Sequence, residues 1–227
     1  MRTLVRIIFL GLKSSLHNYI RTKSPILKVR SEDFSPHHFF RTKVLTTNLF
    51  NCHRYIVNYM TNKILLTSFD TWLPHQKSNS SDDLLAKISQ KQYLPYSLTF
   101  LRKLPVDFEE APNLAIAQIN KIQPDIIICC GMAESRQKLT IESCACGDTD
   151  ILKTAVNLEP LIADLATTEI SHEAGKYVCE ALYYAVLKHI CDAKLPAQSI
   201  FVHVPILTHE NTDKIVADFL LILRQLS

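Results

Sequence analysis

The stretch PDIIICCGM, residues 124–132, places five consecutive apolar residues between a Pro-Asp pair and a glycine. Chain breakers at both ends limit the run to the length of a strand, and its β-branched residues favour that conformation. A strand without polar alternation is typical of a sheet that is covered on both faces. We therefore predict a buried strand over residues 125–130.

Apolar runs of similar length continue on both sides of this strand, and amphipathic segments of helical length separate them. The other predicted strands cover residues 63–69, 97–104, 140–146, 168–172 and 199–206, and the predicted helices cover residues 81–89, 108–122, 176–193 and 211–225. Such alternation implies a largely parallel or mixed sheet with helices on both faces. The predicted fold is therefore α/β, a three-layer α/β/α sandwich with a mixed, mostly parallel central sheet.

The charge distribution divides the chain near Met60. Residues 1–59 contain ten Lys or Arg and two acids, a net charge of +8, whereas residues 60–227 contain fifteen Lys or Arg and twenty acids, a net charge of −5. Two regions of such different balance are not expected to form one structural unit. We expect residues 60–227 to form the α/β domain, and residues 1–59 to be a basic N-terminal extension that is either disordered or upstream of a native start at Met60.

The composition narrows the function classes. The chain has four glycines and contains neither a GxGxxG nor a GxxxxGK[ST] string, so nucleotide binding through those loops has no support. Its seven cysteines form an odd set without framework spacing, which favours reduced thiols in a cytoplasmic protein. A basic arm could bind nucleic acid, but the aromatic residues of residues 1–59 lack a base-reading spacing.

Three ionisable residues lie where reactive groups gather in such folds, at strand ends and helix starts. Cys179 falls in the first turn of a predicted helix, where free N–H groups and the helix dipole favour a thiolate. A free cysteine is, however, more commonly a small buried apolar residue. His203 lies in an apolar strand and suits either a hydrogen-bonded core residue or a base. Glu142, also in an apolar strand, needs a His or Arg partner. Together they make a complete nucleophilic set.

Four segments resemble the type I pyroglutamyl peptidases, also called pyrrolidone-carboxylate peptidases. ISHEAGKYVCEALYY is similar to the family's cysteine motif, and FVHVPIL, whose histidine follows 24 residues after the cysteine, to its histidine motif. PDIIICCGMAESRQKLTIESCA resembles the segment with Gly, Arg and then Glu, and KILLTSFDTWLPHQKSNSS resembles the first strand and pocket loop. The resemblance covers residues 60–227 and none of the chain before them.

The resemblance implies a cysteine exopeptidase that removes N-terminal pyroglutamate from peptides. Cys179 would be the nucleophile, His203 the general base and Glu142 the residue that orients His203. The implied substrate is a peptide with a blocked, pyroglutamyl N-terminus. Members of the family are often oligomeric, which leaves a monomer and a homo-oligomer both open. We expect no cofactor, no metal, and neither a nucleic-acid nor a membrane partner.

The substrate pocket matches the family less closely. Phe69 and Trp72 stand at its aromatic positions and Asn79 at a polar one, although core packing and a helix cap explain Trp72 and Asn79 equally well. Met132 replaces a glutamine, and Glu180 replaces an asparagine beside the nucleophile, where a carboxylate would oppose a thiolate unless it points to solvent.

Two further departures concern loops. WLPHQ replaces a glycine-containing loop, and only 36 residues separate the glutamate from the cysteine, so a substrate-enclosing loop is missing. These departures leave open a catalytically impaired homologue that acts as a binding module, or an amidase of altered specificity.

The string CACGD offers a rival function from another class. Cys144 and Cys146 could form a thiolate metal or redox site, but no second Cys or His pair has zinc-ribbon spacing. Two small residues beside the strand of Glu142 are the simpler interpretation.

Overall fold

A six-stranded sheet organises the described part of the chain, which in this computed structural model comprises residues 62–91 and 94–227. The expectations for residues 1–59 and for a start at Met60 lie outside these residues. The strand order is β2-β1-β3-β8-β4-β7. The strands are β1 (Lys63–Phe69), β2 (Ser97–Leu104), β3 (Ile126–Met132), β4 (Leu139–Glu142), β7 (Thr168–Ser171) and β8 (Gln198–Val204).

The sheet is mixed and mostly parallel, as predicted. Strands β2, β1, β3 and β8 run parallel to one another, and β4 and β7 run parallel to each other. The direction reverses only between β8 and β4, which pair in antiparallel fashion. This reversal brings the chain of β4 alongside β8 from the opposite direction.

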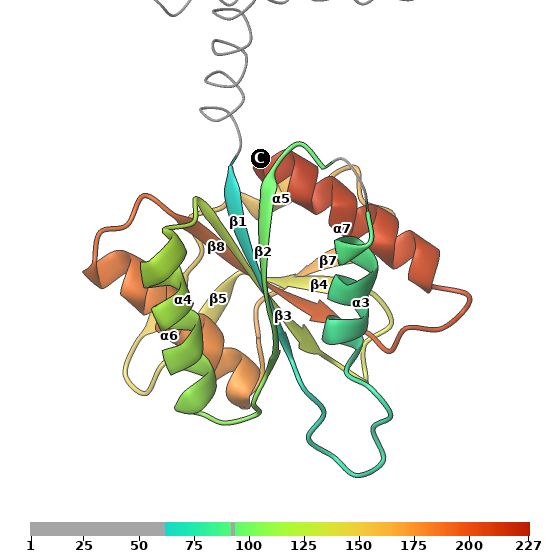
Figure 1. The fold of residues 1–227 in the computed structure, drawn as a ribbon, viewed down its shortest axis with the longest axis horizontal. Coiled ribbons are helices and arrows are strands. Elements are labelled where there is room, and N and C mark those ends of the chain that lie inside the picture. The colour runs from blue at the N-terminus through green and yellow to red at the C-terminus, as the bar shows by residue number, and fades with distance from the viewer. Residues whose placement is uncertain (1–61, 92–93) are drawn as a thin grey trace, which may run out of the picture. The chain divides into compact units, whose positions relative to one another are not determined.

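Helices cover both faces of the sheet and complete the predicted three layers (Figure 1). One face carries α4 (Glu110–Ile122) and α6 (Val178–Asp192), and the other carries α3 (Ser80–Ser89), α5 (Leu158–Ile162) and α7 (Thr212–Leu226). Strand β3 shows why its sequence lacks alternation. Ile126 and Ile128 pack in the core under α3 and α7, whereas Ile127 and Cys129 pack in the core under α4 and α6.

The predicted strand over residues 140–146 is wrong as a single element. β4 ends at Glu142, and β5 (Cys144–Cys146) pairs instead with β6 (Ile151–Lys153) in a separate two-stranded sheet. The break lies at Ser143, whose N–H donates to the carbonyl of Ser171 while its own carbonyl accepts from the N–H of Thr154. Neither β6 nor the five-residue helix α5 was predicted, because both are too short to show a period.

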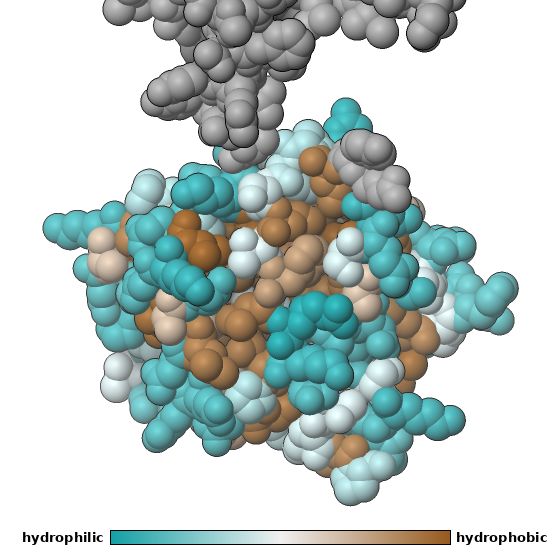
Figure 2. Space-filling view, in the orientation of Figure 1, coloured by the Kyte–Doolittle hydropathy of each residue, from teal (hydrophilic) through white to brown (hydrophobic). Residues whose placement is uncertain are grey.

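The surface over β2 is more apolar than that of the helices beside it. Figure 2 shows apolar side chains in the middle of this face, where β2 forms an edge of the sheet and its Leu98, Phe100 and Leu101 stay partly exposed. Within residues 62–91 and 94–227, the helices are all too short or too polar to span a bilayer.

Candidate active site

A carboxylate–imidazole pair lies where β4 and β8 run side by side. His203 is the register partner of Thr140 in the antiparallel ladder, and Glu142, two residues along β4, presents its side chain to the same face of the sheet. The Nδ1 atom of His203 lies 2.7 Å from Oε1 of Glu142. Glu142 is fully buried and His203 is 5% exposed. The antiparallel pairing therefore joins two of the predicted site residues.

A second donor reaches the same oxygen of Glu142. Nη1 of Arg136 donates to Oε1 at 2.5 Å, while Oε2 has no hydrogen-bond partner within the described residues. Burial by itself would raise the pKa of Glu142, but the contacts with His203, Ser171 and Arg136 together outweigh it, so the pKa lies below its ordinary value. Glu142 therefore remains a carboxylate at neutral pH.

The carboxylate fixes which nitrogen of His203 carries the proton. An ionised carboxylate only accepts hydrogen bonds, so Nδ1 donates and Nε2 of the neutral ring keeps its lone pair. No residue in the described ranges hydrogen-bonds to Nε2. The ring of Phe201 packs against the imidazole at a centroid distance of 4.8 Å. The arrangement leaves Nε2 able to take a proton.

Cys179 lies over β3, beside the strand that carries His203. It is the second residue of α6, and Gly131 below it is the register partner of His203 in the β3–β8 ladder. A Cβ atom on Gly131 would come within 2.6 Å of Sγ of Cys179 and 2.9 Å of Cζ of Phe201. Glycine at this position therefore leaves the space that the thiol occupies. No hydrogen bond joins Sγ to His203 in the part of the chain that the structure describes.

The thiol of Cys179 is less acidic than its place at a helix start predicts. Burial, followed by the negative charge of Glu142, raises its pKa to about 12. The backbone N–H of Cys179 and the charge of Arg136 favour the thiolate, as expected of a helix N-terminus, but they are weaker than burial. The expected lowering of the pKa is therefore wrong, and the thiol needs a base to remove its proton.

Glu180, the residue after the thiol, does not act in the way that the sequence suggests. Its side chain is 9% exposed rather than in solvent, and its Oε1 accepts the backbone N–H of Cys146 at 2.6 Å. Desolvation and the charge of Glu180 raise the pKa of Cys146. The carboxylate that raises the pKa of Cys179 is Glu142. Glu180 thus fastens α6 to β5.

Known proteins with a similar sequence fall in one peptidase family. A profile of the family described as pyroglutamyl peptidase matches residues 62–168 and 158–220. The chain belongs to this family. It is 27% identical over 168 residues to a pyrrolidone-carboxylate peptidase of Oceanobacillus iheyensis, covering 63% of this chain and 83% of that protein. It is also 27% identical over 179 residues to the Pyrococcus furiosus pyrrolidone-carboxylate peptidase, covering 67% and 85%.

Solved structures agree on the fold of this pyroglutamyl peptidase family member. The pyroglutamyl peptidase I of Bacillus amyloliquefaciens superposes with a TM-score of 0.64 at 22% identity, over 72% of this chain and 93% of that one. The Thermococcus litoralis pyrrolidone carboxyl peptidase gives a TM-score of 0.64 at 17% identity, over 72% and 92%. At such identities the likeness establishes the architecture, which confirms the α/β prediction.

The predicted pocket residues of this family member take different places. Phe69 is 2% exposed and packs in the core under α4 and α6. Trp72 is 53% exposed, and its ring lies 6.1 Å from that of Tyr177, two residues before the thiol. The structure thus separates Phe69, a core residue, from Trp72, which meets the start of α6 at the surface.

Asn79 and Met132 both contact the start of α3. Asn79 is the N-cap of that helix: its side-chain oxygen accepts the N–H of Ser81 at 3.0 Å, and its Nδ2 donates to the carbonyl of Asp70 at 3.0 Å. Sδ of Met132 accepts the N–H of Ser80 at 3.4 Å. The polar groups of Asn79 are therefore engaged in holding the loop and the helix together.

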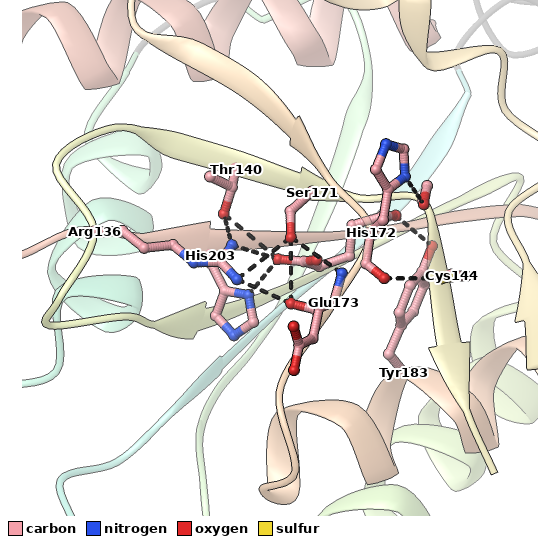
Figure 3. A network of polar contacts seen from close by, with 10 residues as sticks. Arg136, Thr140, Cys144, Ser171, His172, Glu173, Tyr183 and His203 are labelled. Atoms are coloured by element: carbon pink, nitrogen blue, oxygen red, sulfur yellow. Dashed lines mark hydrogen bonds and ion pairs between the residues drawn. The ribbon is translucent and has the colours of Figure 1, made fainter.

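Arg136 was not among the predicted site residues, yet it contacts the buried acid directly. Figure 3 shows Arg136, Thr140, Ser171 and His203 converging on one point. The sequence contained two signals for it: a buried glutamate needs a cationic partner, and the family-like segment has an arginine between its glycine and its glutamate. The structure supplies both partners, His and Arg, at once.

The cysteines of CACGD do not assemble a metal site with their described neighbours. Within residues 62–91 and 94–227, no group of three or more His, Cys, Asp or Glu side chains is placed to hold a metal ion. Cys144 donates instead to the carbonyl of His172 at 3.4 Å. All six described cysteines are free thiols.

Proposed function

We propose that this protein is a cysteine peptidase that removes N-terminal pyroglutamate from peptides, with Cys179 as nucleophile, His203 as general base and Glu142 as the residue that orients the imidazole. One observation carries the proposal: a fully buried carboxylate holds Nδ1 of His203 at 2.7 Å on the strand next to the glycine that accommodates Sγ of Cys179. Membership of the pyroglutamyl peptidase family supports the same activity.

In the first step, Sγ of Cys179 attacks the carbonyl carbon of the amide that joins pyroglutamate to the next residue. Because the pKa of the thiol is raised to about 12, its proton passes to Nε2 of His203 as the S–C bond forms. Oε1 of Glu142 stabilises the resulting imidazolium. The backbone N–H of Cys179, which already faces its own sulfur, is a suitable donor to the oxyanion.

The tetrahedral intermediate then collapses with cleavage of the C–N bond. His203 returns its proton to the leaving amine, which departs as the shortened peptide, and a thioester remains on Cys179. In the second step, His203 takes a proton from water as the oxygen attacks the thioester carbonyl. The proton then returns to sulfur, releasing free pyroglutamate and restoring the thiol.

A second candidate function is an amidase of altered specificity, favoured by the groups that replace the family's polar pocket. Met132 offers a thioether already contacted by the N–H of Ser80, and the amide of Asn79 is engaged as a helix cap. Both side chains are already engaged at the start of α3, and a thioether is a weaker hydrogen-bonding group than an amide, which favours a changed ring specificity. A panel of N-blocked dipeptide amides separates the two functions.

The deciding experiment measures release of a fluorophore from a pyroglutamyl amide by the wild type, Cys179→Ser and Cys191→Ser. Cys191 is the matched control, because it lies on the same helix but is exposed. We expect thiol-dependent release that Cys179→Ser abolishes and Cys191→Ser retains. Release from none of the N-blocked substrates would refute the proposal and favour a catalytically impaired homologue that acts as a binding module.

The cellular setting is part of the same proposal. The free thiols of the described cysteines suit the reducing cytoplasm, where we place the protein. We also propose that residues 60–227 form the functional domain, in line with a family match that begins at residue 62. Mass spectrometry of the natural N-terminus and size-exclusion chromatography test the start at Met60 and a homo-oligomer.

A further inference from the structure

Arg136 joins two separate pieces of chain around the buried acid, β4 and residues 171–173. Its Nη1 donates to Oε1 of Glu142 and to Oγ1 of Thr140, both on β4. Its Nη2 donates to Oγ of Ser171 on β7 at 3.4 Å and to the carbonyl of Glu173 at 3.0 Å. Glu173 belongs to the segment that leads from β7 into α6, the helix that carries the nucleophile. A single guanidinium therefore links the acid to the chain that leads to the thiol.

The carboxylate of Glu142 depends on this contact for its orientation. Its two oxygens are chemically equivalent, and Oε2 has no partner within the described residues, so only the donors at Oε1 decide which oxygen faces His203. One of these donors is His203 itself, which is the group to be oriented. Thr140 lies at the 3.5 Å limit of a hydrogen bond to Oε1. Arg136, at 2.5 Å, is the strong donor that is independent of the base.

The shape of the guanidinium matters as much as its charge. Its nitrogens form a rigid planar fork, so that Nη1 can hold Glu142 while Nη2 holds Glu173 and Ser171. A lysine ammonium would keep a positive charge near Oε1, but as a point charge on a flexible stem it would not hold both sides in a fixed geometry. The side chain of Arg136 is 26% exposed, so the fork is only partly open to solvent.

We propose that Arg136 is a positioning residue of the site, which fixes the Glu142 carboxylate so that it holds His203 in one tautomer and ties that geometry to the segment entering α6. The proposal rests on the peptidase function proposed above. It extends that function to a residue that touches neither the substrate carbonyl nor the thiol in the reaction scheme.

The test uses full-length protein labelled with ¹⁵N-histidine, in which the imidazole ¹⁵N signals of His203 are assigned by comparison with His203→Gln. The wild type should show a single tautomer with the proton on Nδ1. Arg136→Met should show a mixture of tautomers and a kcat lower by about 10- to 100-fold, the usual effect of removing an orienting partner, with KM changed by less than about twofold. Arg136→Lys should restore part of both because it keeps the charge.

Arg102 supplies a matched control. Its guanidinium binds Asp82 with two hydrogen bonds of 2.7 and 2.8 Å, and Asp82 is a buried carboxylate at 7% exposure. Arg102→Met should therefore lower the midpoint of urea unfolding, yet leave the His203 tautomer and kcat as in the wild type. This separates loss of an ion pair from loss of positioning.

Each remaining outcome decides the question. A wild-type tautomer and kcat in Arg136→Met would overturn the proposal, and so would equal losses in Arg102→Met. If Arg136→Met does not fold, Arg136→Lys decides: full wild-type values would show that the fork is not needed and overturn the proposal, and a partial loss would support it. If the wild type has no peptidase activity, the proposed function fails, and the tautomer signals alone still test Arg136.

Discussion

Replacing Gly131 with alanine tests the packing of the nucleophile directly. The new Cβ would stand 2.6 Å from Sγ of Cys179, whereas an ordinary contact begins at 3.4 Å, so the sulfur must retreat by about 0.8 Å. Cζ of Phe201, at 2.9 Å, must also give way. The backbone at Gly131 has no positive φ, so the effect of the substitution is steric and falls first on these two neighbours.

The expected size follows from these overlaps. Overpacking a buried site costs about 1–3 kcal/mol, and alanine in a strand recovers about 0.5–1 kcal/mol relative to glycine, so Gly131→Ala should lose about 1–2 kcal/mol of unfolding free energy. A displacement of the nucleophile near 1 Å costs on the order of 100-fold in rate. We therefore expect a loss of peptidase activity far larger than the modest loss of stability.

Urea unfolding of four proteins measures the stability part: wild type, Gly131→Ala, Cys179→Ala and the double variant. Removing Sγ should relieve part of the overlap, so Gly131→Ala should cost less in the Cys179→Ala background than in the wild type. Some cost should remain there because Phe201 is still too close. Equal costs in both backgrounds, or full peptidase activity in Gly131→Ala, would refute the placement of the thiol over Gly131.

Three further predictions concern charge. Because the pKa of Cys179 is raised to about 12, its alkylation by iodoacetamide should speed up with pH throughout pH 7 to 10. Glu142→Gln removes a negative charge that raises this pKa, so it should accelerate the alkylation at each pH while abolishing peptidase activity. A plateau of the labelling rate below pH 9, measured by mass spectrometry, would contradict this. Glu180→Gln should lower the pKa of Cys146 and speed its labelling, and leave the labelling of Cys179 unchanged; the reverse pattern would disprove our assignment. The pKa of Asp82 is lowered in the folded protein, so its contribution to stability is present above its unfolded pKa and is lost as pH falls below about 4. Asp82→Asn should therefore reduce the fall in the urea unfolding midpoint between pH 7 and pH 3. An unchanged dependence of the midpoint on pH would count against this.

The central strands were predictable because an uninterrupted run of apolar residues indicates burial on both faces of a strand. Five apolar residues in a row, 126–130, signal cover on both faces of β3, and the structure provides it from α3, α4, α6 and α7. The end of β4 was not predictable. Ser143 leaves the sheet because of hydrogen bonds to Ser171 and Thr154, which are distant in sequence, and no local pattern encodes them.

Some features of the site could likewise be predicted from the sequence and others could not. The order of Glu142, Cys179 and His203 in family-like motifs was enough to name them, and the antiparallel pairing of β4 with β8 then joins two of them. The raised pKa of Cys179 could not be read from the sequence. A helix start favours a thiolate, but the opposing burial comes from packing against β3 and β8, which only the folded chain brings together.

The hydrogen bond from Cys146 to Glu180 has a practical consequence for inhibitor studies. Consecutive residues of α6 face different partners: Cys179 lies over the sheet, while Glu180 holds the backbone of Cys146, whose own thiol is exposed. A reagent that alkylates Cys146 therefore adds bulk to a residue that is hydrogen-bonded to Glu180, which directly follows the nucleophile. Inactivation by a thiol reagent identifies Cys179 as its target only when the modified peptide is mapped, or when Cys146→Ser is inactivated at the same rate.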